Sequence, residues 1–200
     1  MLAIKPQLFQ EAASNIGLLL KPHALVFSIL AGTRLARLQA AFPKRSIIRL
    51  MPNLAVAIGK SPMGMFTSAS LDRTAVDQLL SPLGTSFWLT SEDQMDAVTA
   101  LAGSGPAFVY RFIDALAQAG EELGLDAATS LGLAKSMVEG AALLAADSDD
   151  QPQVLARRVT SPGGTTAAGL SVLADKDALK NLVLKTLTAA RDRGADLAKS

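Results

Sequence analysis

The residues best suited to binding or catalysis lie in the tract Val159–Thr166, which reads Val-Thr-Ser-Pro-Gly-Gly-Thr-Thr. Pro162 lacks an N–H group, and the two glycines free the backbone to turn, so that the remaining N–H groups converge where a helix begins. Such a nest binds an anion of carboxylate or phosphate size. The hydroxyls of Ser161, Thr165 and Thr166 both donate and accept, as a ligand amine or imine requires. The alternative is a capped turn between two helices.

A second group of candidates follows short apolar runs near the N-terminus. Lys5-Pro6, Ala31-Gly32 and Asn53 each follow such a run, and the carboxyl ends of strands are where open α/β sheets bind ligands. Strand ends also need turn residues for structural reasons. The stretch Gly103–Pro106 is equally ambiguous, and it is no dinucleotide fingerprint because no third glycine follows at the required spacing.

Composition excludes several kinds of chemistry. The 200 residues contain no cysteine, which excludes disulfides and thiolate nucleophiles, and one histidine, His23, so we expect no metal site. Lys and Arg number 19 against 18 Asp and Glu, a balance that does not indicate nucleic acid or an anionic membrane as a partner. No apolar run reaches the length of a membrane span and no leader precedes Lys5, so we expect a cytoplasmic protein.

The pattern of elements changes near residue 90. Before it, apolar runs at 1–4, 24–30, 46–51 and 86–89 predict strands that alternate with helices at 8–20, 34–42 and 72–80, with a further strand within 59–70. After it, Ser91 and Gln94 form a capping box, a small-residue turn spans 100–106, and the period is helical. We predict an α/β domain with a parallel sheet over 1–90 and an all-α domain over 91–200.

The predicted helix 106–123 is apolar on most of its circumference and ends at Gly124. Such a helix must be covered on most sides, and a small helical domain offers few helices to cover it. The pattern therefore favours a partner subunit. An interior helix within a monomer is the alternative.

Five segments resemble motifs of pyrroline-5-carboxylate reductase, in the same order and over nearly the whole chain. They are Ala3–Gln7, Ser28–Gly32, Arg49–Asn53, Asp96–Phe108 and Leu155–Leu173. The resemblance implies a partial Rossmann-like sheet followed by a helical dimerisation domain. It also implies reduction of 1-pyrroline-5-carboxylate to L-proline, the last step of proline biosynthesis, with NADPH or NADH as the hydride donor. Members assemble as homodimers or rings of dimers.

The resemblance also implies roles for individual residues. The backbone at Gly163, Gly164 and Thr165 would hold the substrate carboxylate, and the catalytic Thr166 would hydrogen-bond the ring nitrogen. Other residues that would bind substrate are Val159, Ser161 and Asp149. The residues that would border the cofactor are Lys5, Pro6, Ala31, Gly32 and Asn53.

Two departures from the family pattern stand out. Leu54-Ala55 replaces the usual Thr-Pro after Asn53, which removes a hydroxyl near the cofactor. The sequence also contains no G-x-G-x-x-G turn, so we expect a fragment of a longer reductase in which activity is weak or lost. The alternatives are a non-catalytic helical dimerisation module derived from the enzyme and a reductase of another imine or hydroxy acid.

Overall fold

The sheet of the computed structural model has four strands in the order β1-β2-β3-β4. The model describes residues 1–4, 6–17, 19–21 and 23–197. The strands are β1 (Leu25–Ser28), β2 (Ser46–Met51), β3 (Ser61–Phe66) and β4 (Gly84–Trp88). All four lie where the sequence predicts strands, and β2 has the predicted bounds. The run at the N-terminus contributes one bridge, Leu2 with Ser28.

The sheet is mixed rather than wholly parallel. β1 pairs with β2 and β3 pairs with β4 in parallel, while β2 and β3 are antiparallel. The connection 52–60 between β2 and β3 holds only the 3-10 turn η2 (Leu54–Ile58). A parallel crossover needs about a dozen residues or more, so the short connection forces the chain to reverse.

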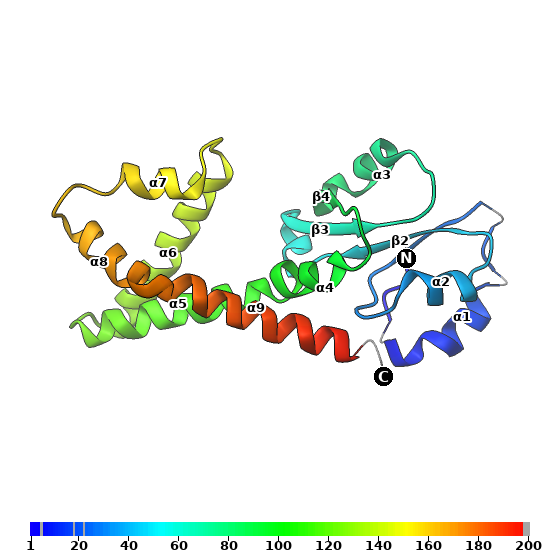
Figure 1. Ribbon diagram of the computed structural model, residues 1–200, viewed down its shortest axis with the longest axis horizontal. Coiled ribbons are helices and arrows are strands. Elements are labelled where there is room, and N and C mark those ends of the chain that lie inside the picture. The colour runs from blue at the N-terminus through cyan, green and yellow to red at the C-terminus, as the bar shows by residue number, and fades with distance from the viewer. Residues whose placement is uncertain (5, 18, 22, 198–200) are drawn as a thin grey trace. The chain divides into compact units, whose positions relative to one another are not determined.

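Helices cover both faces of the sheet (Figure 1). α1 (Phe9–Gly17) and α2 (Leu35–Ala41) pack with Ile47 on one face, and α3 (Arg73–Leu80) packs with Ile48 on the other. Successive strand residues point to opposite faces, and both isoleucines are at most 2% exposed. The continuous apolar run of β2 thus reflects a strand buried on both sides.

The remainder of the chain is helical, as predicted. Its helices are α4 (Gln94–Val98), α5 (Gly105–Glu122), α6 (Ala127–Ala146), α7 (Pro152–Arg158), α8 (Thr165–Ala174) and α9 (Ala178–Leu197). The chain forms two compact units, one of Met1–Pro106 with Thr186–Ser200 and one of Ala107–Lys185. The domain boundary at residues 90 and 91 stays a prediction.

The link between α5 and α6 is built from local signals. Gly124 has φ +102°, and the amides of Gly124 and Leu125 donate to the carbonyls of Glu121 and Gly120 in a Schellman motif. Asp126 then caps α6 by accepting from the Thr129 amide at 3.0 Å. The predicted end of the helix at Gly124 is confirmed.

The predicted turn over 100–106 is wrong. The chain stays helical there as a π-helix, η4 (Thr99–Gly103), closed by the Ser104 amide donating to the Thr99 carbonyl at 2.9 Å. Small residues let this segment lie against the sheet: Gly64 on β3 faces the methyl groups of Val98 so closely that a Cβ has no room. Tertiary packing therefore outweighs the turn-forming tendency of the glycines.

Candidate functional site

The tract after α7 forms a tight turn in the unit 107–185. Gly163 has φ +70°, a conformation that favours glycine. The Gly164 amide donates to the Ser161 carbonyl at 3.1 Å, and the Ser161 hydroxyl fills the space where a Cβ on Gly164 would stand. Gly164 thus shapes the turn, and its amide is already engaged.

The free donors lie one residue further along, at the N-terminus of α8. The structure gives the amides of Thr165, Thr166 and Ala167 no acceptor among the described residues. The first amides of a helix have no intrahelical partner, and the helix dipole adds partial positive charge. Both threonine side chains are exposed, as is Val159, at 69%. This end of α8 can hold a small anion with hydroxyl groups next to it.

The acidic pair before α7 divides into two roles. Asp150 forms an ion pair with Arg158 at 2.5 Å, and its amide donates to the Ser148 hydroxyl. Asp149 is exposed. The ion pair joins the two ends of the segment that leads to Val159, while the substrate contact expected of Asp149 stays a prediction.

The second group of candidates lies at one edge of the sheet in the other unit. β1 and β2 are parallel neighbours, so the segments that follow them, with Ala31-Gly32 and Asn53, leave the sheet at the same edge. Gly32 has φ +71° and makes the turn after β1. Lys5 lies outside the described residues, and Pro6 begins the 3-10 turn η1 (Pro6–Leu8).

Asn53 binds neighbouring backbone with both ends of its side chain. Its Oδ1 accepts from the Ala55 amide at 2.9 Å, and its Nδ2 donates to the Ala102 carbonyl of η4 at 3.0 Å. A π-helix displaces carbonyls from the α-helical pattern, and such turns are frequent at functional sites. Through this bond to Ala102, Asn53 fastens η4 to the end of β2.

A charged network that the sequence analysis missed lies beside this edge. Arg49 of β2 is 3% exposed, and its guanidinium donates to Glu92 Oε1 at 2.7 Å. Glu92 Oε1 also accepts from the Leu35 amide at 2.5 Å. Arg34 pairs with Asp93 at the surface, and this hydrogen bond raises the pKa of the Arg34 guanidinium above its ordinary value.

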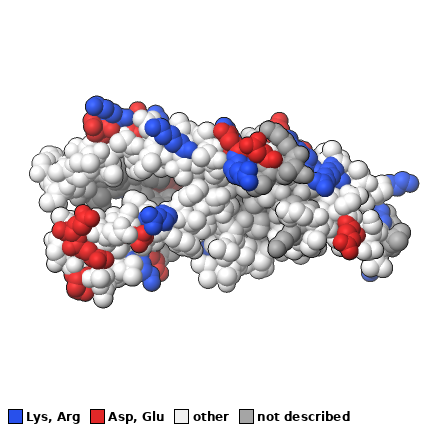
Figure 2. Space-filling view, turned by 90° about the horizontal axis from the view of Figure 1, so that it is seen from below, with Lys and Arg blue, Asp and Glu red and all other residues white. Residues whose placement is uncertain are grey.

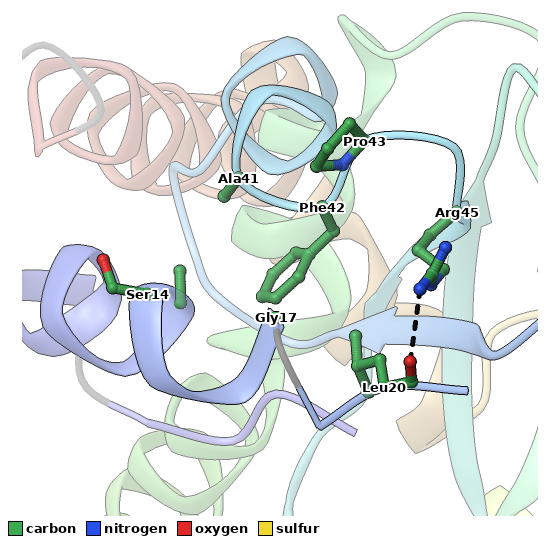
Figure 3. A pocket seen from close by; sticks show the side chains of 8 residues that line it. Ser14, Gly17, Leu20, Ala41, Phe42, Pro43 and Arg45 are labelled. Carbon is green, nitrogen blue, oxygen red and sulfur yellow. Dashed lines mark hydrogen bonds between the residues drawn. The ribbon is translucent and has the colours of Figure 1, made fainter. Parts of the chain in front are cut away.

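A hollow of about 300 Å³ lies where α1 and α2 end. Ser14, Gly17, Leu20 and Phe42 are among its lining residues, and Arg45 donates to the Leu20 carbonyl at 3.2 Å (Figure 3). Arg45 directly precedes β2, so the hollow lies at the opposite sheet edge from Asn53. It contains none of the predicted site residues.

Among the described residues, no three His, Cys, Asp or Glu side chains gather in a way that could hold a metal ion. No helix in that part of the chain is long and apolar enough to span a membrane. The cytoplasmic location stays a prediction. The structure thus offers two candidate sites, the N-terminus of α8 and the sheet edge that follows β1 and β2, each within its own unit.

Comparison with known proteins identifies the family. The sequence model of one protein family, described as pyrroline-5-carboxylate reductase dimerisation, matches residues 92–197. The pyrroline-5-carboxylate reductase of Pseudomonas aeruginosa is 37% identical over the whole chain, which spans 74% of that enzyme. The chain belongs to the pyrroline-5-carboxylate reductase family. The predicted resemblance is confirmed.

Other pyrroline-5-carboxylate reductases match the chain in sequence and in structure. The Glycine max enzyme is 37% identical over 98% of the chain and 72% of its own length. The Coxiella burnetii enzyme structure superposes with a TM-score of 0.91 at 32% identity, covering 99% of this chain and 75% of that one. The Plasmodium falciparum enzyme, solved with NADP bound, gives 0.83 at 28% identity, with 98% and 79% covered. The predicted fold class, a partial Rossmann-like sheet followed by a helical dimerisation domain, is confirmed.

Proposed function

We propose that this chain reduces 1-pyrroline-5-carboxylate to L-proline with NADPH or NADH. The ring nitrogen enters protonated, a hydride from the nicotinamide adds to the carbon of the C=N bond, and the π electrons become the nitrogen lone pair. The oxidised cofactor leaves with L-proline. The reaction needs no metal or protein nucleophile, so the protein acts by positioning and electrostatics.

The N-terminus of α8 is the proposed substrate site. The amides of Thr165 and Thr166 point their partial positive charge at the substrate carboxylate, with Gly163 and Gly164 supplying the turn. The Thr166 hydroxyl accepts a hydrogen bond from the protonated ring nitrogen and keeps the proton on that atom. Ser161, Val159 and Asp149 complete the proposed surroundings of the ring.

The sheet edge is the proposed site for the nicotinamide end of the cofactor. Ala31 and Gly32 present little side-chain bulk there, which fits the approach of a flat ring to the backbone. Asn53 uses one amide hydrogen and one oxygen lone pair internally, so its part is to hold the edge in shape while its remaining hydrogen-bonding capacity faces the ligand. Lys5 and Pro6 belong to the same proposal through the family resemblance.

The observation that carries the proposal is the row of amides at the start of α8 to which the described residues offer no acceptor. An NMR titration with L-proline, the product, tests it directly. We expect the amide signals of Gly163, Thr165 and Thr166 to shift, because a carboxylate binds there. L-proline methyl ester, which has no carboxylate, is the control and should shift them much less. Equal shifts with both compounds, or shifts confined to other segments, would contradict the proposed site.

We propose that the protein assembles as a homodimer. If the chain does not catalyse the reaction, the main alternative is that it acts as a dimerisation module only. Large apolar side chains stand exposed on α5 and α6, among them Phe112 at 49%, Leu133 at 57% and Leu144 at 74%. Figure 2 shows broad uncharged areas between separate clusters of charge. Exposed apolar surface of this kind marks an interface, and a second copy can cover it.

Sedimentation equilibrium tests the assembly. Phe112→Glu places a charge among the exposed apolar side chains, so we expect a monomer where the unchanged chain forms a dimer. Gln118→Lys on the same helix is the control, because it also adds a charge but at an exposed polar position, where a donor can still reach the Asp114 carboxylate that Gln118 contacts. A dimer that survives Phe112→Glu would place the interface elsewhere. A module without catalytic function would dimerise but show no shift with L-proline.

A further inference from the structure

Arg49 is a buried cation on an interior strand of the sheet. Its side chain is 4% exposed, and Ile47 and Met51, which share its face of β2, are 2% and 7% exposed. A charge in such surroundings must be paired. Its partner is Glu92, at 2.7 Å, whose side chain is 20% exposed.

Glu92 makes a second contact that an ion pair alone does not require. The same Oε1 atom accepts from the Leu35 amide at 2.5 Å. Leu35 is the first residue of α2, and the residue at the cap position, Arg34, makes no side-chain hydrogen bond to the helix. Glu92 therefore acts as the missing N-terminal cap of α2 from a distant part of the sequence.

The capped helix begins directly after the turn Ala31–Thr33. Within the turn, the described backbone hydrogen bond is the one from the Thr33 amide to the Leu30 carbonyl, at 3.4 Å, which is long. Gly32 is the pivot of the turn, at φ +71°. The position of the turn therefore depends on how α2 is held at its first residue.

Glu92 also lies just before α4, whose continuation, η4, is fastened to the end of β2 by the bond from Asn53 to Ala102. The buried Arg49 thus lies at the centre of a chain of contacts. It holds Glu92, and Glu92 holds α2, while the segment that follows Glu92 returns to Asn53. Both proposed cofactor-facing segments are tied to one buried cation.

We propose that Arg49 and Glu92 are positioning residues for the cofactor edge: Arg49 orients the Glu92 carboxylate, and Glu92 caps α2 and so fixes the turn Ala31–Thr33 against the nicotinamide. The inference rests on the proposed function for the identity of the ligand. The competing explanation is that the pair only stabilises the fold. The two explanations differ in which ligand loses affinity.

The double variant Arg49→Met with Glu92→Leu separates them. It removes both charges together, and replacing a buried ion pair by apolar residues of similar volume is often neutral or favourable for stability. It also removes the cap. We expect the unfolding midpoint to stay near that of the unchanged protein, while the Leu35 amide exchanges hydrogen about tenfold faster or more. The Kd for NADPH, followed by its fluorescence, should rise about tenfold, and the Kd for L-proline should change less than about twofold.

Asp93→Asn is the matched control. Asp93 is the neighbour of Glu92 and pairs with Arg34, but its side chain is 79% exposed and it does not cap α2. All four measurements should stay near their unchanged values. Should the double variant fail to fold, Glu92→Asp keeps the charge for Arg49 but is one methylene too short to reach Leu35 as well. This variant should also raise the Kd for NADPH and leave the Kd for L-proline nearly unchanged, but the rise should be smaller than in the double variant.

Three results would overturn the proposal. Unchanged exchange at Leu35 would show that Glu92 is not the cap. Faster exchange with an unchanged Kd for NADPH would leave the pair a purely structural role, and equal loss of both ligands would indicate a global effect. If the unchanged protein binds neither NADPH nor L-proline, the proposed function fails. Exchange at Leu35 then decides by itself whether Glu92 holds the turn.

Discussion

Gly120 of α5 lies against Ser130 of α6, and Gly120→Ala should destabilise the protein. A Cβ at this position would overlap the Ser130 hydroxyl, which is buried and donates to the Ala117 carbonyl at 2.6 Å. Displacing that hydroxyl costs about 1–3 kcal/mol if its hydrogen bond is lost, and overpacking costs about 1–3 kcal/mol more. The higher helix propensity of alanine offsets about 1 kcal/mol of this loss in the free energy of unfolding. The expected net loss is about 3 kcal/mol, the centre of a range of about 1–5 kcal/mol.

Urea unfolding followed by circular dichroism measures this loss, at several protein concentrations so that association is accounted for. Gly132→Ala is the matched control, because it is also a helical glycine but a Cβ there meets open space. It should stabilise the protein by about 0.5–1 kcal/mol. Ser130→Ala should cost about 1 kcal/mol by itself.

The combination Gly120→Ala with Ser130→Ala decides whether the hydroxyl is the cause. Without it the new methyl group has more room, so the double variant should be more stable than the sum of the two single losses by at least about 1 kcal/mol. If Gly120→Ala is as stable as the unchanged protein, or if the two losses simply add, the packing explanation is refuted.

Three other predictions follow from the structure. Thr166→Ala should lower kcat by about tenfold or more while the Kd for NADPH stays unchanged, because in the proposed site the lost hydroxyl would contact only the substrate ring nitrogen. An unchanged kcat would remove Thr166 from the mechanism, and Ser171→Ala on the same helix is the control. The hydrogen bond from Thr129 lowers the pKa of Asp126. The ionised Asp126 carboxylate therefore stabilises the fold above the ordinary aspartate pKa of about 3.9, and this stabilisation is lost as pH falls through the lower pKa of the folded state. Asp126→Asn should abolish that part of the pH dependence in acid unfolding curves. Gly64→Ala should lower the melting temperature, because Val98 leaves its Cβ no room.

Most elements could be predicted from the sequence because their signals are local. Gly124 ends α5 and Asp126 begins α6 through contacts within a few residues, and the apolar run Ser46–Met51 is the whole of β2. The direction of β3 was not predictable in this way, since it depends on the closure of the chain. The helical state of Thr99–Gly103 depends on contacts with the sheet, which no local pattern of small residues reveals.

In the candidate site, too, the features with local sequence signals could be predicted and those that depend on distant contacts could not. The turn at Gly163-Gly164 and the helix start at Thr165 could be predicted, because glycine conformation and helix capping are local properties. The pair of Arg49 with Glu92 was missed because its members are distant in sequence. One signal was present: a single arginine within the apolar strand Ile47–Met51. A charge there requires a buried partner, although the sequence does not say which acidic residue supplies it.

Trp88 on β4 has a practical consequence for studying the two units. It is the chain's only tryptophan, and its indole N–H donates to Asp77 at 3.0 Å while Arg73 lies over the ring at 4.8 Å from the centroid. Its emission spectrum is therefore a built-in optical reporter of the sheet-containing unit alone. Melting curves recorded by tryptophan emission and by helical ellipticity would coincide if the two units lose their structure together and separate if they do not.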